Sequence, residues 1–239
     1  VSYYIPERQS EGYGLNLEAL EHIISDGASL VITVDCGISS YDIVEAVCDR
    51  IDIIITDHHT APPQIPPARA VINHKQPDCP YTDKNLSGVG VAFKLCQALW
   101  LRQCGEWYLD DLDIVALGTV ADVVPLVGEN RIIVQAGLKK MNELPNLGID
   151  KLIDVAGLHD KTITAGHIGF TLAPRLNAAG RVTHATRAVE LLVTDDVDLA
   201  ETIAQELQET NMERQEIERS IHEEARANVA AQGHLAGYV

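Results

Sequence analysis

Two runs of apolar residues are each followed directly by side chains that could do chemistry. The run Leu30–Val34 leads into Asp35, and the run Ile51–Thr56 leads into Asp57-His58-His59. Both runs are typical of buried parallel strands. Because open α/β sheets bind ligands at the carboxyl ends of their strands, we expect these carboxylates and imidazoles to converge. Such a group favours a divalent metal ion and a phosphate as ligands.

The two adjacent histidines predict two different roles. His58 and His59 cannot point the same way from an extended strand, but the chain can turn where the strand ends. One imidazole can then bind a metal ion while the other meets a substrate. A purely structural role is the alternative, which a tandem pair after an aspartate disfavours.

A third acid, Asp122, closes the apolar run Ala116–Ala121. An ordinary helix end is one explanation. Coordination of a metal ion is the other, because it would account for an acid directly after so apolar a segment. Oxygen and imidazole ligands suit Mn²⁺ or Mg²⁺, whereas structural zinc is disfavoured because the sequence has no thiolate cluster.

The beginning of one expected helix predicts an anion contact. Ser87, Gly88 and Gly90 lie where backbone N–H groups at a helix N-terminus can hold a phosphate. A plain turn explains the same residues equally well.

The segment Pro174–Arg181 predicts a second phosphate contact. Arg175, Asn177 and Arg181 flank small residues in a protein that has only 18 basic residues. Arginine forks suit phosphate oxygens, and a solvated turn is the alternative.

The pattern of apolar runs predicts an α/β fold with a doubly wound, mainly parallel sheet. A strand–helix–strand–helix–strand order is expected from Val1–Pro6, Leu17–Ser25 and residues 30–34, 39–47 and 51–56. Six prolines then mark loops within residues 61–81, around one short strand at Ala70–Ile72. Helices are expected to follow, at residues 90–104 and 109–121 and within 130–157 and 164–193.

The last part of the chain predicts one long helix. Residues 198–231 contain no proline or glycine, and their loose apolar stripe indicates a helix of about 30 residues. This helix could complete the core or connect to a further domain. We expect residues 1–195 to form one domain and residues 196–239 to form the connecting helix.

Composition limits the classes of protein to which the chain could belong. With 239 residues, of which 46% are hydrophobic and 22% charged, it is an ordinary globular sequence. The net charge of −17 argues against simple electrostatic docking on nucleic acid, although bound metal ions reverse the field of clustered carboxylates. No membrane span or signal peptide is visible, and five cysteines without paired spacing suit a reducing cytoplasm.

These motifs occur in the order seen in one known family. The chain resembles the DHH-family phosphoesterases over nearly its whole length, and is most similar to the RecJ single-stranded-DNA-specific exonucleases. The resemblance is carried by Asp35-Cys36-Gly37, Asp57-His58-His59, Gly118–Asp122, Arg175–Arg181, Tyr4–Arg8, Glu11–Leu15 and Ser87–Lys94. The DHH triplet assigns only the superfamily, whereas Arg175–Arg181 and the beginning of the chain narrow it to RecJ.

The resemblance implies a two-metal site that usually holds Mn²⁺. Asp35, His58 and Asp122 would be metal ligands, with Asp35 between the two ions. His59 would face the scissile phosphate, and Asp57 would support the imidazoles from behind. Two ions so placed would activate a water and stabilise the leaving oxygen.

The same resemblance implies a substrate and partners. Arg175, Asn177, Arg181 and Arg8 would contact phosphates of single-stranded DNA, hydrolysed from 5′ to 3′ in DNA repair and recombination. A single-strand-binding protein or a helicase would be the expected protein partner. No membrane partner is implied.

Two parts of the family pattern are absent from the sequence. An Asp-x-Asp cluster after a first strand would precede Val1, and a small DHHA1 domain would follow the long helix. We therefore expect the middle of a RecJ protein, nearly inactive by itself. An oligoribonuclease, a cyclic-dinucleotide phosphodiesterase, an inorganic pyrophosphatase and a non-catalytic scaffold that binds DNA or replication proteins are the alternatives.

Overall fold

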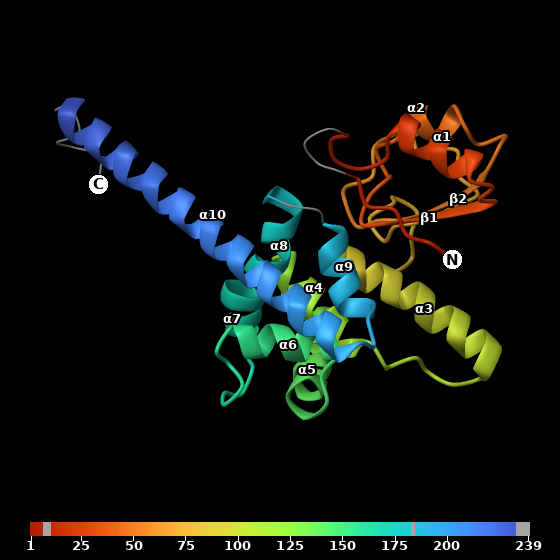
Figure 1. The fold of residues 1–239 in the computed structure, drawn as a ribbon. Helices are drawn as coiled ribbons and strands as arrows, with labels where there is room; N and C mark the ends of the chain where they lie inside the picture. Colours follow the sequence, from red (N-terminus) through yellow and green to blue (C-terminus); the bar gives the residue numbers. More distant parts are fainter. Residues whose placement is uncertain (7–10, 183–184, 233–239) are drawn as a thin grey trace.

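A three-stranded parallel sheet forms the amino-terminal part of the molecule (Figure 1). The structure is a computed structural model that describes residues 1–6, 11–182 and 185–232. The strands run in the order β1 (Leu30–Val34), β2 (Asp52–Thr56) and β3 (Ala70–Ile72). Val34 lies beside Thr56, and Thr56 beside Ile72. All three strands therefore end at the same edge.

Helices pack against both faces of this sheet, although one face of β1 is left exposed. On one face, α1 (Leu17–Ser25) and α2 (Tyr41–Glu45) pack against the strands through a cluster that includes Leu20, Val44 and Ile55. On the other face, Ile72 packs against the cluster formed with α3 (Gly88–Cys104). The predicted doubly wound α/β fold is confirmed.

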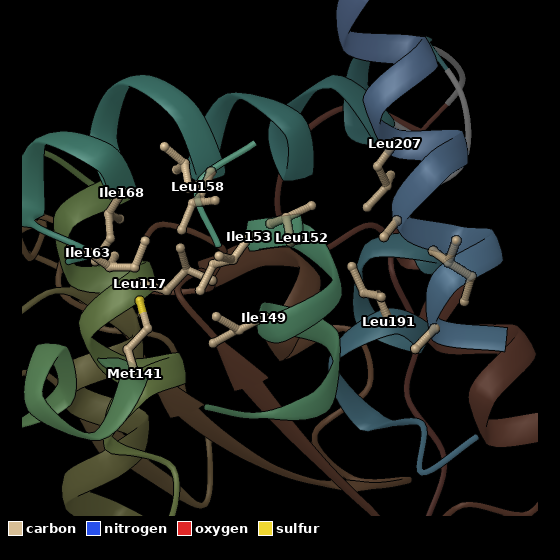
Figure 2. Close-up of a cluster of buried hydrophobic side chains, with 14 residues drawn as sticks. Leu117, Met141, Ile149, Leu152, Ile153, Leu158, Ile163, Ile168, Leu191 and Leu207 are labelled. Atoms are coloured by element: carbon tan, nitrogen blue, oxygen red, sulfur yellow. The ribbon is translucent and has the colours of Figure 1, made fainter. Parts of the chain in front are cut away.

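A larger helical part follows the sheet. Its elements are α4 (Leu112–Ala121), α5 (Gly128–Glu143), α6 (Leu147–Val155), α7 (Ala165–His167), the π-helical turn η1 (Ile168–Leu172), α8 (Ala173–Val182) and α9 (Thr186–Val193). Figure 2 shows the buried core that joins them, in which Leu117, Met141, Leu152, Ile168 and Leu207 are each at most 3% exposed. This core fixes the direction of α4, and Asp122 is the C-cap residue that follows it.

The last helix, α10 (Val197–Gln232), is a single helix of 36 residues, as the sequence predicts. Its first half buries Ala200, Ile203 and Leu207 in the core. Its second half leaves the body of the molecule and exposes Ile217 and Ile221 by 56% and 62% (Figure 1). Neither α10 nor any other helix in the described ranges is long and apolar enough to cross a membrane.

Four sequence predictions of local structure are wrong. The helix expected at residues 39–47 spans only Tyr41–Glu45. Val1–Pro6 is not a strand, because no neighbouring strand among the described residues pairs with it and its first four residues are exposed. The helix expected from Gly90 begins at Gly88, since the Ser87 side chain accepts a hydrogen bond from the Gly90 N–H and so caps it. The helix expected from Leu109 begins only at Leu112.

The projecting half of α10 leads to a stability prediction. Leu207→Ala should lower the free energy of unfolding by about 2–5 kcal/mol, because it leaves a cavity in the core. Ile221→Ala, on the same helix, should change it by less than about 0.5 kcal/mol, because its side chain meets solvent. Urea unfolding of the 239-residue chain measures both. Equal losses would show that the second half of α10 is packed.

Candidate metal centre

The end of β1 turns sharply at Asp35. This residue has a φ of +62°, a left-handed conformation that is uncommon for residues other than glycine, and its N–H donates to the Thr56 carbonyl at 3.0 Å. Gly88 at the start of α3 lies against the Asp35 side chain. A Cβ at Gly88 would come within 2.2 Å of Asp35 Oδ1, so only glycine fits there. The turn at Asp35 and the missing side chain at Gly88 therefore leave room for the Asp35 carboxylate beside the start of α3.

The end of β2 is organised by the buried carboxylate of Asp57, which is 1% exposed. Its Oδ2 accepts from the Ile38 N–H at 2.9 Å, and its Oδ1 accepts from the His58 and His59 N–H groups at 2.7 and 3.1 Å. Burial alone would raise the pKa of Asp57, but these hydrogen bonds and one from the His59 ring hold it below its ordinary value. Asp57 is thus a structural anion that supports both histidines.

The imidazole of His58 lies between two acids. Its Nε2 is 3.1 Å from Asp35 Oδ1 and 3.4 Å from Asp122 Oδ2, while the residue itself is only 7% exposed. The contact with Asp35 is the largest influence on the pKa of His58 and raises it above the ordinary value, against the effect of burial. Residues from three separate elements meet here.

Asp122 reaches the centre from the end of α4. Its N–H donates to the Gly118 carbonyl at 3.0 Å, and burial raises the pKa of its carboxyl group. Gly118 allows α4 to approach the start of α3, because a Cβ there would lie 2.8 Å from Val89 Cγ1. The next residue, Val123, has a φ of +58° and is 86% exposed, a strained conformation for a β-branched residue.

The donor atoms fit a divalent cation. Two ligands at right angles around an octahedral ion, each about 2.1 Å from it, lie about 3 Å apart, which matches the separations of His58 Nε2 from the two acids. Within the described part of the chain, Asp35 Oδ1 and His58 Nε2 are buried, and they make no polar contacts other than those among the candidate ligands themselves. Buried polar atoms left in this way need a partner, and a cation supplies one. Ligand atoms of Asp35, His58 and His59 all lie within 4.8 Å of one another.

His59 is the exposed member of the pair. Its Nδ1 is 2.7 Å from Asp57 Oδ1, and 47% of its side chain is accessible. Tyr13 meets this ring edge-on, with centroids 6.4 Å apart, and donates its hydroxyl to the Asp35 carbonyl at 3.2 Å. With Nδ1 engaged by Asp57, Nε2 is the nitrogen left to meet a metal ion, a water or a substrate oxygen.

Known proteins share much of the sequence of this chain. The DHH family, N-terminal domain, matches residues 1–119. Single-stranded-DNA-specific exonuclease RecJ of Bacillus subtilis (strain 168) is 44% identical over 234 residues, which cover 98% of this chain and 29% of the relative. The RecJ of Escherichia coli (strain K12) is 41% identical, with 94% and 41% covered. The chain belongs to the DHH family.

Solved RecJ structures share the fold as well as the sequence. The crystal structure of exonuclease RecJ bound to manganese superposes with a TM-score of 0.83 at 35% identity, covering 91% of this chain and 55% of that one. RecJ in complex with Mn²⁺ from Thermus thermophilus gives 0.76 at 34% identity, covering 86% and 31%. This DHH chain thus spans between about a third and a half of the length of its relatives.

In this DHH-family structure, the residues predicted to open an anion site are buried. The Ser87 hydroxyl lies 3.0 Å from Thr119 Oγ1 and caps α3 through the Gly90 N–H, while Gly88 adjoins Asp35. These contacts join the beginning of α3 to α4 and to Asp35. A phosphate contact by Ser87, Gly88 or Gly90 stays a prediction.

The RecJ-like segment around Arg175 falls on α8. Arg175 Nε donates to Gln208 Oε1 at 2.7 Å and its Nη1 to the Thr171 carbonyl at 2.5 Å, so part of its guanidinium braces α8 against its neighbours. Asn177 is exposed on the same helix. Arg8 and the side chain of Arg181 lie outside the described residues. Substrate contacts by these four residues stay predictions.

The sequence reasoning missed one polar triplet at the same sheet edge. Asn73-His74-Lys75 directly follows β3, just as Asp57-His58-His59 follows β2. Asn73 is 2% exposed and its Nδ2 donates to the His59 carbonyl at 2.9 Å. Burial lowers the pKa of His74, which is 5% exposed. The strand-end rule used for the other two strands would have found this triplet.

The close approach of Gly88 and Asp35 leads to a test of the centre. Gly88→Ala should weaken Mn²⁺ binding by about tenfold or more, because the added methyl displaces a ligand. Gly166→Ala is the matched control, since its Cβ would meet only Thr164 Oγ1, at 3.6 Å. Electron paramagnetic resonance of free Mn²⁺ measures both. Unchanged binding by a folded Gly88→Ala chain would exclude Asp35 as a ligand.

Proposed function

We propose that this chain is the catalytic part of a metal-dependent exonuclease that hydrolyses single-stranded DNA from 5′ to 3′. The observation that carries the proposal is the group formed by Asp35, His58 and Asp122, within a chain that superposes on manganese-bound RecJ with a TM-score of 0.83. The names of the relatives, single-stranded-DNA-specific exonucleases at 36–44% identity, supply the substrate class.

Asp35, His58 and Asp122 would hold Mn²⁺ or Mg²⁺ at the carboxyl edge of the sheet. When bound, a pair of such ions lowers the pKa of a water nucleophile and stabilises the leaving oxygen of a phosphodiester. His59 stands at the exposed side of the ligands, where its Nε2 can orient a phosphate oxygen or the attacking water. Asp57 fixes the His59 ring for this task through Nδ1.

We further propose that residues 1–195 are a DHH domain that needs one more strand and its acids, and that residues 196–239 connect it to another domain. The edge strand β1 supports the first part, because Leu30, Ile32 and Val34 on one of its faces are 46–54% exposed. Such an apolar edge is unusual for a finished sheet. The projecting half of α10 supports the second part. The 239-residue chain alone should then turn over DNA far more slowly than a longer gene product.

The proposed setting is DNA repair and recombination in the cytoplasm. A single-strand-binding protein or a helicase would deliver the strand. The protein's net charge of −17 makes such delivery useful, because simple electrostatic attraction to DNA is weak.

An activity assay on the full-length gene product tests the proposal. It should release nucleotides from 5′-labelled single-stranded DNA in a Mn²⁺-dependent manner, and Asp122→Asn should reduce turnover at least about a hundredfold. Asp160→Asn removes the same charge from an exposed loop, where its side chain is 86% accessible, and should leave turnover unchanged.

Three outcomes would contradict this function. Equal turnover by the Asp122→Asn variant would show that the reaction does not need Asp122 as a metal ligand. Faster digestion of 5′-blocked strands than of free ones would reverse the polarity. Mn²⁺-independent DNA binding with no hydrolysis by the full-length product would favour a non-catalytic scaffold.

A further inference from the structure

The triplet that follows β3 brings a lysine to the metal centre. Lys75 is half-buried, and its backbone N–H donates to Asn73 Oδ1 at 2.7 Å. The same Asn73 side chain donates from Nδ2 to the His59 carbonyl at 2.9 Å. One buried amide thus ties the Lys75 loop to the loop that carries the exposed histidine.

The positive charge of Lys75 acts on the pKa values of two of the candidate ligands. Contact with Asp35 is the main influence on the pKa of His58, and burial is the main influence on the pKa of Asp122. The ammonium group of Lys75 lowers the pKa of each of these two groups. No carboxylate among the described residues forms an ion pair with Lys75. By contrast, Lys94 and Lys140 pair with Glu129 and Asp113.

No contact within the described residues gives the Lys75 ammonium group a partner, and a bound ligand would supply one. The charge of Lys75 repels a divalent metal ion, so it does not help to build the metal site. A phosphate bound at that metal ion would be attracted by the same charge. Arg175, which the sequence predicts as a phosphate contact, instead donates hydrogen bonds from two of its nitrogens within the protein.

We propose that Lys75 contacts the phosphate of the bound strand beside the metal ligands, and that Asn73 positions it there relative to His59. The inference rests on the proposed function and adds a substrate-binding residue to it. Lys75 neutralises charge on the phosphate that approaches His59, in a protein whose net charge is −17. Lys75 therefore weakens binding of the metal ion and strengthens binding of the strand.

Binding measurements on the full-length gene product separate these effects. Lys75→Met should weaken binding of a fluorescent single-stranded oligothymidylate several-fold and lower the slope of log affinity against log salt by about 0.7, measured from about 50 to 200 mM KCl without metal. Lys75→Arg should keep the slope. The dissociation constant for Mn²⁺ should not rise in Lys75→Met, because the lost charge opposed the ion.

Lys161→Met is the control for loss of one positive charge. Lys161 is exposed in the loop between α6 and α7, and its removal should leave the slope unchanged. If the unaltered protein binds the strand and Lys75→Met has the same slope, the inference is wrong and the proposed function stands. If Lys75→Met weakens Mn²⁺ and DNA together, Lys75 is structural and the inference is again wrong. If the unaltered protein neither binds nor cuts the strand, the proposed function fails first.

Discussion

The buried carboxylate of Asp57 holds together the part of the molecule on which the candidate centre depends. It accepts hydrogen bonds from Ile38, which follows β1, and from both histidines that follow β2. A charged carboxylate is stable at 1% exposure only because these donors surround it. The ends of two neighbouring strands are therefore tied to one anion, and the orientations of His58 and His59 follow from it.

A second constraint joins this sheet edge to the helical part. Gly88 lies against Asp35, and Gly118 allows α4 to approach Val89 at the start of α3. These two close approaches, together with the contact between Ser87 and Thr119, bring Asp122 to within 3.4 Å of His58. The centre is thus assembled by steric fit between helices as much as by the sheet. A methyl group at Gly88 would have to displace the Asp35 side chain, and one at Gly118 would have to displace Val89 or α4.

Much of the fold and part of the centre could be predicted because strand ends obey a simple rule. The apolar runs before Asp35 and Asp57 indicated neighbouring parallel strands, and the structure places them in register. Val1–Pro6 has strand-like residues too, but β-structure needs a partner strand, which local sequence does not reveal. The strand before Asn73-His74-Lys75 was also predicted, so the same rule extends to this triplet. The use of Arg175 as a brace depends on Gln208, 33 residues away, which no local pattern shows.

The central claim is that Asp35, His58 and Asp122 are ligands of a divalent cation at the carboxyl edge of the sheet. Crystals of the chain soaked in Mn²⁺, with anomalous diffraction recorded near the manganese edge, test it most directly. The account predicts an anomalous peak about 2.0–2.2 Å from Asp35 Oδ1 and His58 Nε2, on the side that also faces Asp122. A peak elsewhere on the molecule, or none while the three side chains keep their positions, would contradict it.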